Sequence, residues 1–185
     1  MRIKEWDYYL VNNGRFALAL TVADNGYMGL DSISFIDLEN LWQQTVSPMS
    51  VMPLGRRELP ESSAAGDVSV SGKNYSMSFR HIPGGRKLAF AMQDFSGSLP
   101  IQGEIVLTHE PEESIVMCTP FHKKAHFYYN QKINCMRASG TVVVRGRHYE
   151  FEPDTAFAVL DWGRGVWTYR NTWYWGSASG EAEGV

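Results

Sequence analysis

The pattern that most constrains the fold is an alternation of apolar and polar residues with a period of two, in short runs along the whole chain. In residues 75–80, for example, Tyr75, Met77 and Phe79 alternate with polar side chains. Alternate residues of a β-strand share one face, so such a run has one buried and one solvated side. No segment sustains the period of an amphipathic helix. The sequence therefore predicts an all-β protein.

Turn residues between the runs predict an antiparallel meander. Asn12-Asn13-Gly14 and Asp24-Asn25-Gly26 separate the first three runs, and Asn, Asp and Gly accept the positive φ angles of tight hairpin turns. Three prolines, Pro48, Pro53 and Pro60, indicate that residues 42–60 form an extended or edge segment and not a central strand. The predicted strands are 6–11, 16–23, 27–35, 68–71, 75–80, 87–92, 101–107, 115–119, 127–137, 141–145, 147–151 and 155–160.

So many short strands favour a β-barrel or a barrel-like sandwich. We prefer a barrel, because closure removes the exposed edges that a meander otherwise leaves. A length of 185 residues suits a single domain, which we place at residues 1–176. Residues 177–185 are small and polar and predict a flexible tail or a linker.

Composition limits the classes of binding partner and the cellular compartment that we expect for this protein. With 17 basic and 20 acidic residues the net charge is −3, so the chain lacks the basic excess that nucleic-acid binding requires. Charges interrupt the N-terminus where a signal peptide needs an apolar core, and no apolar run is long enough to span a membrane. We expect a cytoplasmic protein without a membrane span, in which Cys118 and Cys135 are free, buried thiols, with a single disulfide between them as the less favoured alternative.

Neither a metal nor a cofactor is expected. His122 and His126 are four residues apart, but no Asp, Glu or Cys ligand lies near them in the sequence, and Pro120 argues against the helix that this spacing would need. The chain has no Gly-rich phosphate loop and no dinucleotide-binding pattern.

The candidate site lies in residues 155–176, which contain four of the six tryptophans. We predict that strand 155–160 leads into a turn, Asp161-Trp162-Gly163-Arg164-Gly165, and that an aromatic strand follows at 166–175. These rings either line a cavity for an apolar ligand or fill the core. The candidate ligand-binding residues are Trp162, Trp167, Tyr169, Trp173, Trp175 and, from another run, Tyr129.

Asp161 and Arg164 are the candidate catalytic residues. A carboxyl group in apolar surroundings can keep its proton, because desolvation disfavours the charged form, and this would suit a general acid. The structural interpretation, which we weigh more heavily, is that Asp161 pairs with Arg164 or caps the turn.

Several motifs together resemble a bacterial family of domains of unknown function. They are Glu5-Trp6-Asp7-Tyr8-Tyr9, Ala23-Asp24-Asn25-Gly26-Tyr27, Ser34-Phe35-Ile36-Asp37, Pro53-Leu54-Gly55, Leu160-Asp161-Trp162-Gly163-Arg164-Gly165 and Trp173-Tyr174-Trp175-Gly176. That family is distantly similar to carotenoid 1,2-hydratase and AttH-type proteins. The resemblance covers essentially the whole chain and implies a calycin, or lipocalin-like, barrel, typically two in tandem, of which this chain would be the first. It also implies that Arg164 or Arg170 stacks on Trp6 or Trp162 as a cation–π plug.

Three functional hypotheses follow. The first is a lipocalin-like protein that binds a small hydrophobic ligand, lipid- or isoprenoid-like, in an aromatic-lined barrel. The second, implied by the hydratase comparison, is a cofactor-free hydratase or isomerase in which Asp161 protonates an alkene. The third is a structural half that is completed by a second β-domain or by homo-oligomerisation.

Overall fold

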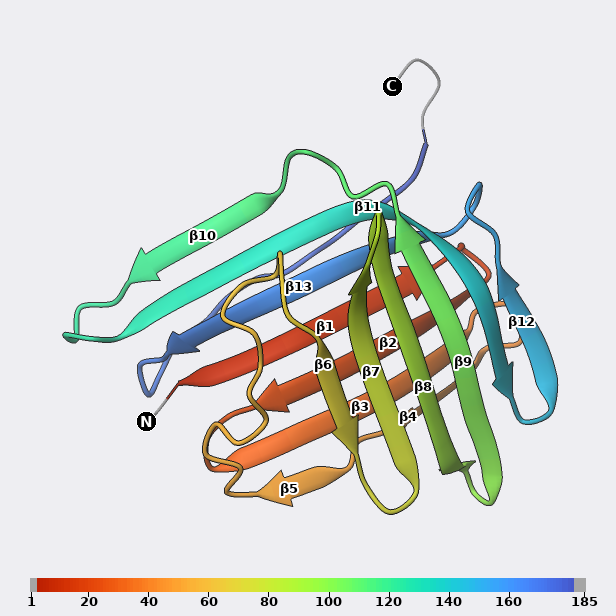
Figure 1. Cartoon of the computed structure of the whole chain (residues 1–185), viewed down its shortest axis with the longest axis horizontal. Helices are drawn as coiled ribbons and strands as arrows, with labels where there is room; N and C mark the ends of the chain where they lie inside the picture. The colour runs from red at the N-terminus through yellow and green to blue at the C-terminus, as the bar shows by residue number, and fades with distance from the viewer. Residues whose placement is uncertain (1–2, 182–185) are drawn as a thin grey trace.

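The computed structural model describes residues 3–181, which form thirteen β-strands and no helix. All the strands belong to one antiparallel sheet, in the order β4-β3-β2-β1-β13-β11-β9-β8-β7-β6 (Figure 1). β5 pairs with β3, while β10 and β12 both pair with β11. The prediction of an all-β, antiparallel protein is confirmed. The described residues form no helix that could span a membrane.

The strands span the following residues: β1 (Lys4–Asn12), β2 (Phe16–Asp24), β3 (Met28–Asp37), β4 (Trp42–Val46), β5 (Met49–Val51), β6 (Val68–Ser71), β7 (Tyr75–Ile82), β8 (Gly85–Ser96), β9 (Leu99–Thr108), β10 (Ile115–Pro120), β11 (Phe127–Val144), β12 (Arg147–Phe151) and β13 (Phe157–Val166).

The first three strands form the predicted meander. Its turns are stabilised by their own polar side chains: the Gly14 N–H donates to Asn12 Oδ1 over 2.6 Å, and the Gly26 N–H donates to Asp24 Oδ1 over 2.7 Å. Such bonds favour the tight turn before any tertiary contact forms. The meander thus places β1 inside the sheet, between β2 and β13.

A bend in β11 folds the sheet over on itself. The first part of β11 pairs with β10 and β13, and its second part pairs with β9 and β12. The register on β13 shifts between Ile133 and Met136, so β11 carries one extra residue there, and Cys135 has a φ of 60°. A bulge of this kind bends a strand and increases its twist. The strands β6–β9 consequently cross in front of β1–β3 (Figure 1).

Apolar side chains from both parts of the folded sheet fill the space between them. The largest fully buried side chains include Tyr9, Phe35, Phe95 and Phe151. Phe16 packs edge-on against Phe151, with ring centroids 4.8 Å apart. Because these rings occupy the interior, its core is packed with side chains.

The sheet is open, so our preference for a closed barrel was wrong. β4 and β6 end the strand order, and no ladder between described residues joins them. Their edges are short, with five residues in β4 and four in β6. A short edge strand offers few unpaired backbone groups, which is another way to limit edge-to-edge association.

The C-terminal prediction also needs correction. β13 runs on to Val166, and residues 167–181 form no strand, so the predicted strand at 166–175 is absent. The segment instead runs along the sheet on the side away from β6–β9 (Figure 1). Of the predicted tail, Ser177 contacts Asn134 and Glu181 pairs with Arg137, whereas residues 182–185 lie outside the described part. Cys118 and Cys135 are exposed, not buried as predicted.

The bulge can be tested at Cys135. A left-handed φ costs an L-residue about 1–2 kcal/mol, and β-branched residues tolerate it least. We expect Cys135→Val to lower the free energy of unfolding by about 1–2 kcal/mol and Cys135→Gly to maintain or raise it. Urea unfolding of the three proteins measures this. Equal losses in both variants would contradict the assigned backbone conformation.

Candidate functional site

Residues 161–165, which were predicted to form a turn, belong to β13 instead and continue its alternation between the two faces of the sheet. Leu160, Trp162 and Arg164 point to the inner face of the sheet, which carries the core, and Asp161, Gly163 and Gly165 point to the outer face. Glycines at alternate positions were interpreted as turn residues. Here they keep the outer face of a central strand free of side chains.

Cross-strand pairing builds the outer site. β13 lies between β1 and β11, so its outward residues Asp161, Gly163 and Gly165 each have a neighbour on both sides. The three rows are Tyr8–Asp161–Lys132, Trp6–Gly163–Asn130 and Lys4–Gly165–Tyr128. The sheet therefore brings together residues from three separate parts of the sequence.

Gly163 is required by the close approach of its neighbours. A Cβ atom at this position would overlap the Trp6 ring and would lie 3.0 Å from Asn130 Nδ2. A Cβ at Gly165 would collide with the Phe127 carbonyl and would lie 3.1 Å from the Trp167 ring. The two glycines thus let indole rings lie close against the backbone of β13.

Asp161 accepts hydrogen bonds from three donors. Trp6 Nε1 donates to Asp161 Oδ1 over 3.1 Å, Asn130 Nδ2 donates to the same oxygen over 2.6 Å, and Lys132 Nζ forms an ion pair with Oδ2. The side chains of Asp161 and Lys132 are only 13% and 10% exposed. This arrangement requires a carboxylate that accepts on both oxygens. Its partner is Lys132, not Arg164 as the structural interpretation had it.

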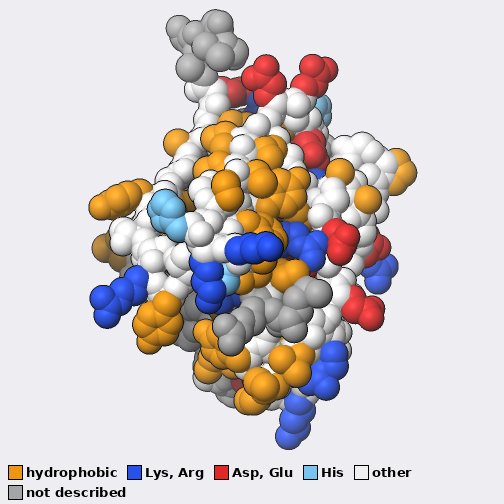
Figure 2. All heavy atoms as spheres, turned by 90° about the vertical axis from the view of Figure 1, so that its left-hand side faces the viewer, with side chains coloured by type: hydrophobic (Ala, Val, Ile, Leu, Met, Phe, Trp, Pro, Cys, Tyr) orange, Lys and Arg blue, Asp and Glu red, His pale blue; other side chains and the backbone are white. Residues whose placement is uncertain are grey.

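Against these outward side chains of β1, β11 and β13 lies a cavity of about 640 Å³, which we call the outer aromatic cavity. The C-terminal segment covers the sheet here, and β10 and its following loop add Met117 and Phe121. Figure 2 views the molecule from the end where β1 begins and where β10 and β13 end; hydrophobic side chains gather on this side, with basic ones among them. The lining residues are Lys4, Trp6, Asn25, Met117, Phe121, Tyr128, Lys132, Asp161, Trp167, Thr168, Tyr169, Asn171, Thr172, Trp173, Tyr174 and Trp175.

Aromatic and cationic contacts hold the C-terminal segment on the sheet. The Trp167 ring lies 5.3 Å from that of Trp6 and 5.6 Å from that of Tyr128, measured between centroids. Lys132 Nζ lies 5.4 Å from the Trp175 ring. Each cation–π contact contributes about 0.5–1 kcal/mol when exposed and more when desolvated.

The environment raises the pKa of the nearby phenol groups further above neutral pH. Burial, and to a lesser degree the charge of Asp161, raises the pKa of Tyr128 to about 12. The same two causes raise the pKa of Tyr8. At neutral pH the phenol of Tyr128 at the cavity wall therefore has its proton available for donation.

The predicted site residues divide between the two faces. Asp161, Trp167, Tyr169, Trp173 and Trp175 line the outer aromatic cavity. Trp162, Tyr129 and Arg164 belong to the inner face instead.

Trp162 is 2% exposed and meets Tyr129 edge-on at 5.3 Å. Arg164 pairs with Glu5 at 2.6 Å, directly across the β1–β13 ladder. The arginine cation–π contacts among residues 3–181 involve Arg137 and Arg145, so the predicted plug of Arg164 or Arg170 on tryptophan is wrong.

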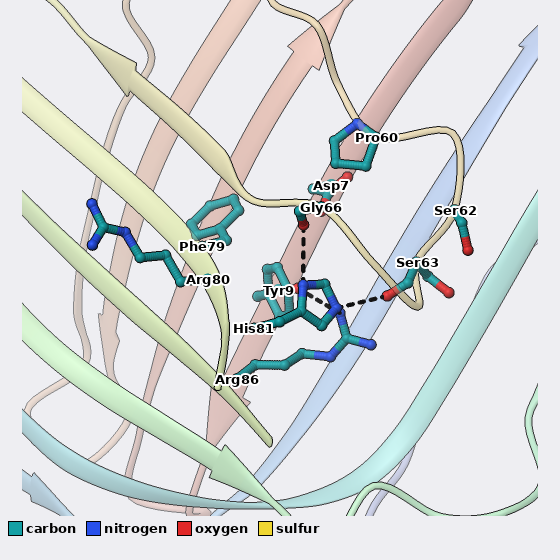
Figure 3. Close-up of a pocket in the computed structure, with 10 residues that line it drawn as sticks. All are labelled: Asp7, Tyr9, Pro60, Ser62, Ser63, Gly66, Phe79, Arg80, His81 and Arg86. Atoms are coloured by element: carbon teal, nitrogen blue, oxygen red, sulfur yellow. Dashed lines mark hydrogen bonds between the residues drawn. The ribbon is translucent and has the colours of Figure 1, made fainter. Parts of the chain in front are cut away.

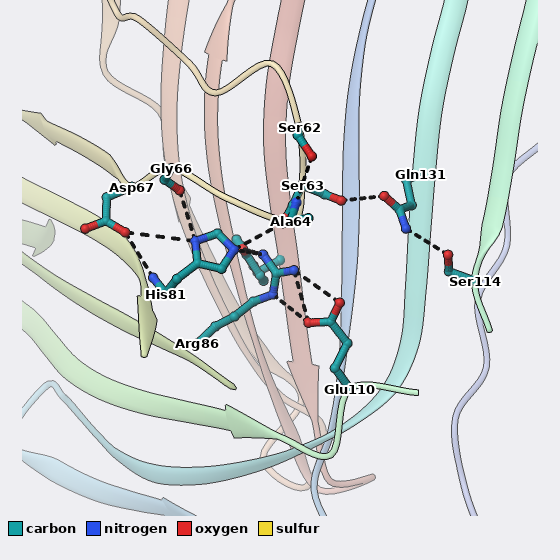
Figure 4. A network of polar contacts seen from close by, with 11 residues as sticks. Ser62, Ser63, Ala64, Gly66, Asp67, His81, Arg86, Glu110, Ser114 and Gln131 are labelled. Atoms are coloured by element: carbon teal, nitrogen blue, oxygen red, sulfur yellow. Dashed lines mark hydrogen bonds and ion pairs between the residues drawn. The ribbon is translucent and has the colours of Figure 1, made fainter. Parts of the chain in front are cut away.

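A second polar group, the inner polar cluster, was missed by the sequence analysis. It consists of Asp7, Tyr9, His81, Arg86 and Glu110, and it lies beneath the loop of residues 60–66 (Figures 3 and 4). Arg86 Nη2 pairs with Glu110 at 3.1 Å, and Arg86 Nη1 lies 3.1 Å from His81 Nε2. The one usable signal was the alternation of β1, which puts Asp7 on the face of Tyr9.

His81 ties the covering loop to this cluster. Its Nδ1 lies 3.0 Å from the Gly66 carbonyl, and its Nε2 lies 3.1 Å from the Ser63 carbonyl (Figure 3). Because a carbonyl oxygen can only accept, Nδ1 is the donor to Gly66, whereas Nε2 faces both the Ser63 carbonyl, which can only accept, and the Arg86 guanidinium, which can only donate. The void beneath the loop measures about 10 Å³, which is room for about one water molecule.

Asp7 is the exceptional member of the cluster. Its side chain is buried, and Oδ1 has no hydrogen-bond partner among the described residues. Burial raises the pKa of Asp7 to about 7, although the nearby Arg86 opposes the change. A buried carboxyl without a partner is most stable when it is protonated.

The described residues contain no group of three His, Cys, Asp or Glu side chains placed to hold a metal ion. His122 and His126 lie in the exposed connection between β10 and β11, where His126 Nδ1 contacts the Lys124 carbonyl at 3.1 Å.

The folded, open antiparallel sheet is of the lipocalin-like type found in AttH proteins. The structure resembles that of an AttH-type protein from Nitrosomonas europaea, with a TM-score of 0.54 and 12% identity over 92% of this chain and 53% of that one. Kievitone hydratase from Nectria haematococca gives a TM-score of 0.45 and 11% identity, over 88% of this chain and 47% of that one. The chain therefore spans about half the length of these proteins.

Residues 1–185 match the family described as a domain of unknown function, DUF2804, and the chain belongs to it. No curated protein is significantly similar to the chain. The family match and the lipocalin-like fold confirm these two parts of the resemblance that the motifs indicated.

The Asp161–Lys132 pair can be tested by a double-mutant cycle. Removing one partner of a buried ion pair leaves an uncompensated charge, which costs several kcal/mol. We expect Asp161→Asn to lower the free energy of unfolding by about 3 kcal/mol, and the double variant with Lys132→Met to recover more than half of this loss. Urea unfolding provides the values. Additive losses would show that the two groups are energetically independent.

Asp7 gives a prediction for the pH dependence of stability. Because the folded protein binds this proton more tightly than the unfolded chain, the contribution of Asp7 is fully present below about pH 4 and is lost as the pH rises to about 7. Relative to Asp7→Asn, the wild type should lose up to about 3 kcal/mol of stability between about pH 5 and pH 8. Parallel unfolding profiles of the two proteins across this range would contradict the raised pKa.

Proposed function

We propose that the protein binds a small hydrophobic ligand, lipid- or isoprenoid-like, in the outer aromatic cavity. The observation that carries this proposal is the cavity itself, with a volume of about 640 Å³ and walls formed largely by aromatic rings. Ligand sites are typically concave, mostly apolar and of this size, with a few polar groups that orient the ligand. The proposed site therefore lies on the outer face of the sheet, whereas the first hypothesis placed the ligand inside the barrel.

The chemistry of the walls supports a flat or flexible apolar ligand. Trp173 and Trp175 are 72% and 41% exposed although both are large and hydrophobic. Exposed aromatic rings gathered around one hollow are typical of interaction sites. A ligand that covers them would remove this apolar surface from water, at about 25 cal/mol per Å².

The geometry gives less support to a hydratase or isomerase with Asp161 as general acid. Asp161 does line the cavity, but its three donors fit a carboxylate that accepts hydrogen bonds. Arg164, its predicted helper, points to the other face of β13 and pairs with Glu5. An acid role for Asp161 would first require the loss of its ion pair with Lys132.

The third hypothesis, a structural half, draws support from a different surface. Leu41, Met49 and Val51 are 93%, 69% and 85% exposed near the edge formed by β4 and β5. A second β-domain or a second copy of the chain would cover such residues. This hypothesis is compatible with ligand binding, because these residues do not line the cavity.

Binding can be measured with 1-aminoanthracene, a flat probe that carries no charge at neutral pH. We expect a saturable rise in its fluorescence with the wild type and about tenfold weaker binding to Trp173→Ala, because the variant removes one aromatic wall worth about 1.4 kcal/mol. Leu41→Ala is the matched control, since Leu41 is a large exposed side chain outside the cavity.

Two results would contradict the proposal. One is the absence of saturable binding to the wild type. The other is equal affinity of the wild type and Trp173→Ala, which would place the probe elsewhere on the protein.

A further inference from the structure

The charges of the outer aromatic cavity select among hydrophobic ligands. Three charged side chains line the cavity, namely Lys4, Lys132 and Asp161. Lys132 and Asp161 form an ion pair with each other. The remaining charge is the ammonium group of Lys4, so the cavity carries a net positive charge within a protein whose net charge is −3.

The carboxylate of Asp161 is poorly placed to recognise a cationic ligand. Its Oδ1 already accepts from Trp6 and Asn130, and its Oδ2 is paired with Lys132. A cationic head would have to displace a buried lysine from its counter-charge, which is costly. The acidic residue of the cavity is therefore already engaged and does not offer a free counter-charge to a cationic head.

Lys4 is held at the cavity by aromatic rings. Its Nζ lies 5.7 Å from the centroid of the Trp167 ring and 5.9 Å from that of Tyr27. Aromatic faces attract an ammonium group electrostatically, so the donors that point away from the two rings stay available for a ligand. None of the ion pairs formed among residues 3–181 includes Lys4.

We propose that the ligand is an amphipathic anion, with an apolar body against the tryptophan walls and a carboxylate or similar acidic head on Lys4. This inference rests on the proposed function and adds the polarity of the ligand and the residue that reads it. Asn25, Thr168 and Asn171 line the same cavity and offer further donors for an oxyanion. A charge-assisted hydrogen bond from a lysine is about twice as strong as a neutral one.

The test compares three ligands that share one chain and differ only in the head: dodecanoate, dodecan-1-ol and dodecylammonium. Each displaces 1-aminoanthracene from the wild type, Lys4→Met, Lys4→Arg and Lys73→Met. Lys73 is an exposed lysine in the turn before β7 and serves as the matched control. Dodecanoate and dodecylammonium are used below their micellar concentrations, and dodecan-1-ol below its solubility limit.

We expect the wild type to bind dodecanoate about tenfold more tightly than dodecan-1-ol, and dodecylammonium more weakly than either. Lys4→Met should abolish the preference for the acid while keeping the affinity for the alcohol. Lys4→Arg and Lys73→Met should keep the preference, and added salt should reduce it.

The outcomes separate this inference from the function on which it rests. Equal binding of acid and alcohol by the wild type, or an unchanged preference in Lys4→Met, overturns the anionic head and leaves hydrophobic binding intact. If 1-aminoanthracene does not bind the wild type saturably, the proposed function itself fails, and the inference fails with it.

Discussion

The structure depends on the position of β13 between β1 and β11. This pairing joins the first and the last strands of the described chain, and it gives most residues of β13 one neighbour on either side. Because side chains alternate across a strand, the same ten residues supply the core with Leu160 and Trp162 and the outer site with Asp161. A shift of the register by one residue would exchange the two sets.

Both faces of this region contain buried charges, and the protein stabilises them in different ways. Asp161 and Lys132 neutralise each other on the outer face, and Glu5 and Arg164 do so on the inner face. Asp7 has no such partner, and burial raises its pKa to about 7. An ion pair thus offsets the cost of desolvation in the first two cases, and in the third a raised pKa favours the neutral form of Asp7.

Much of the fold was predictable because it depends on local patterns. Alternation marks most of the strands, and Asn12 and Asp24 mark the first turns by side-chain bonds to nearby backbone N–H groups. The closed barrel was not predictable in the same way, because closure depends on whether β4 meets β6, and nothing in either strand encodes the other. Gly163 and Gly165 misled the prediction of a turn, since a glycine also permits the close packing of a ring.

The sequence by itself determined the all-β class, most of the strands and the first turns, because these follow from the spacing of neighbouring side chains, and it singled out residues 155–176 as the candidate site. Only the tertiary structure decided which face each of those residues occupies and which charge each one meets. Lys132 lies 29 residues from Asp161 in the sequence and Lys4 lies farther still, yet cross-strand pairing sets them on one surface. Ladder register is a property of the assembled sheet, and this is why the partners of Asp161 were beyond the reach of the sequence.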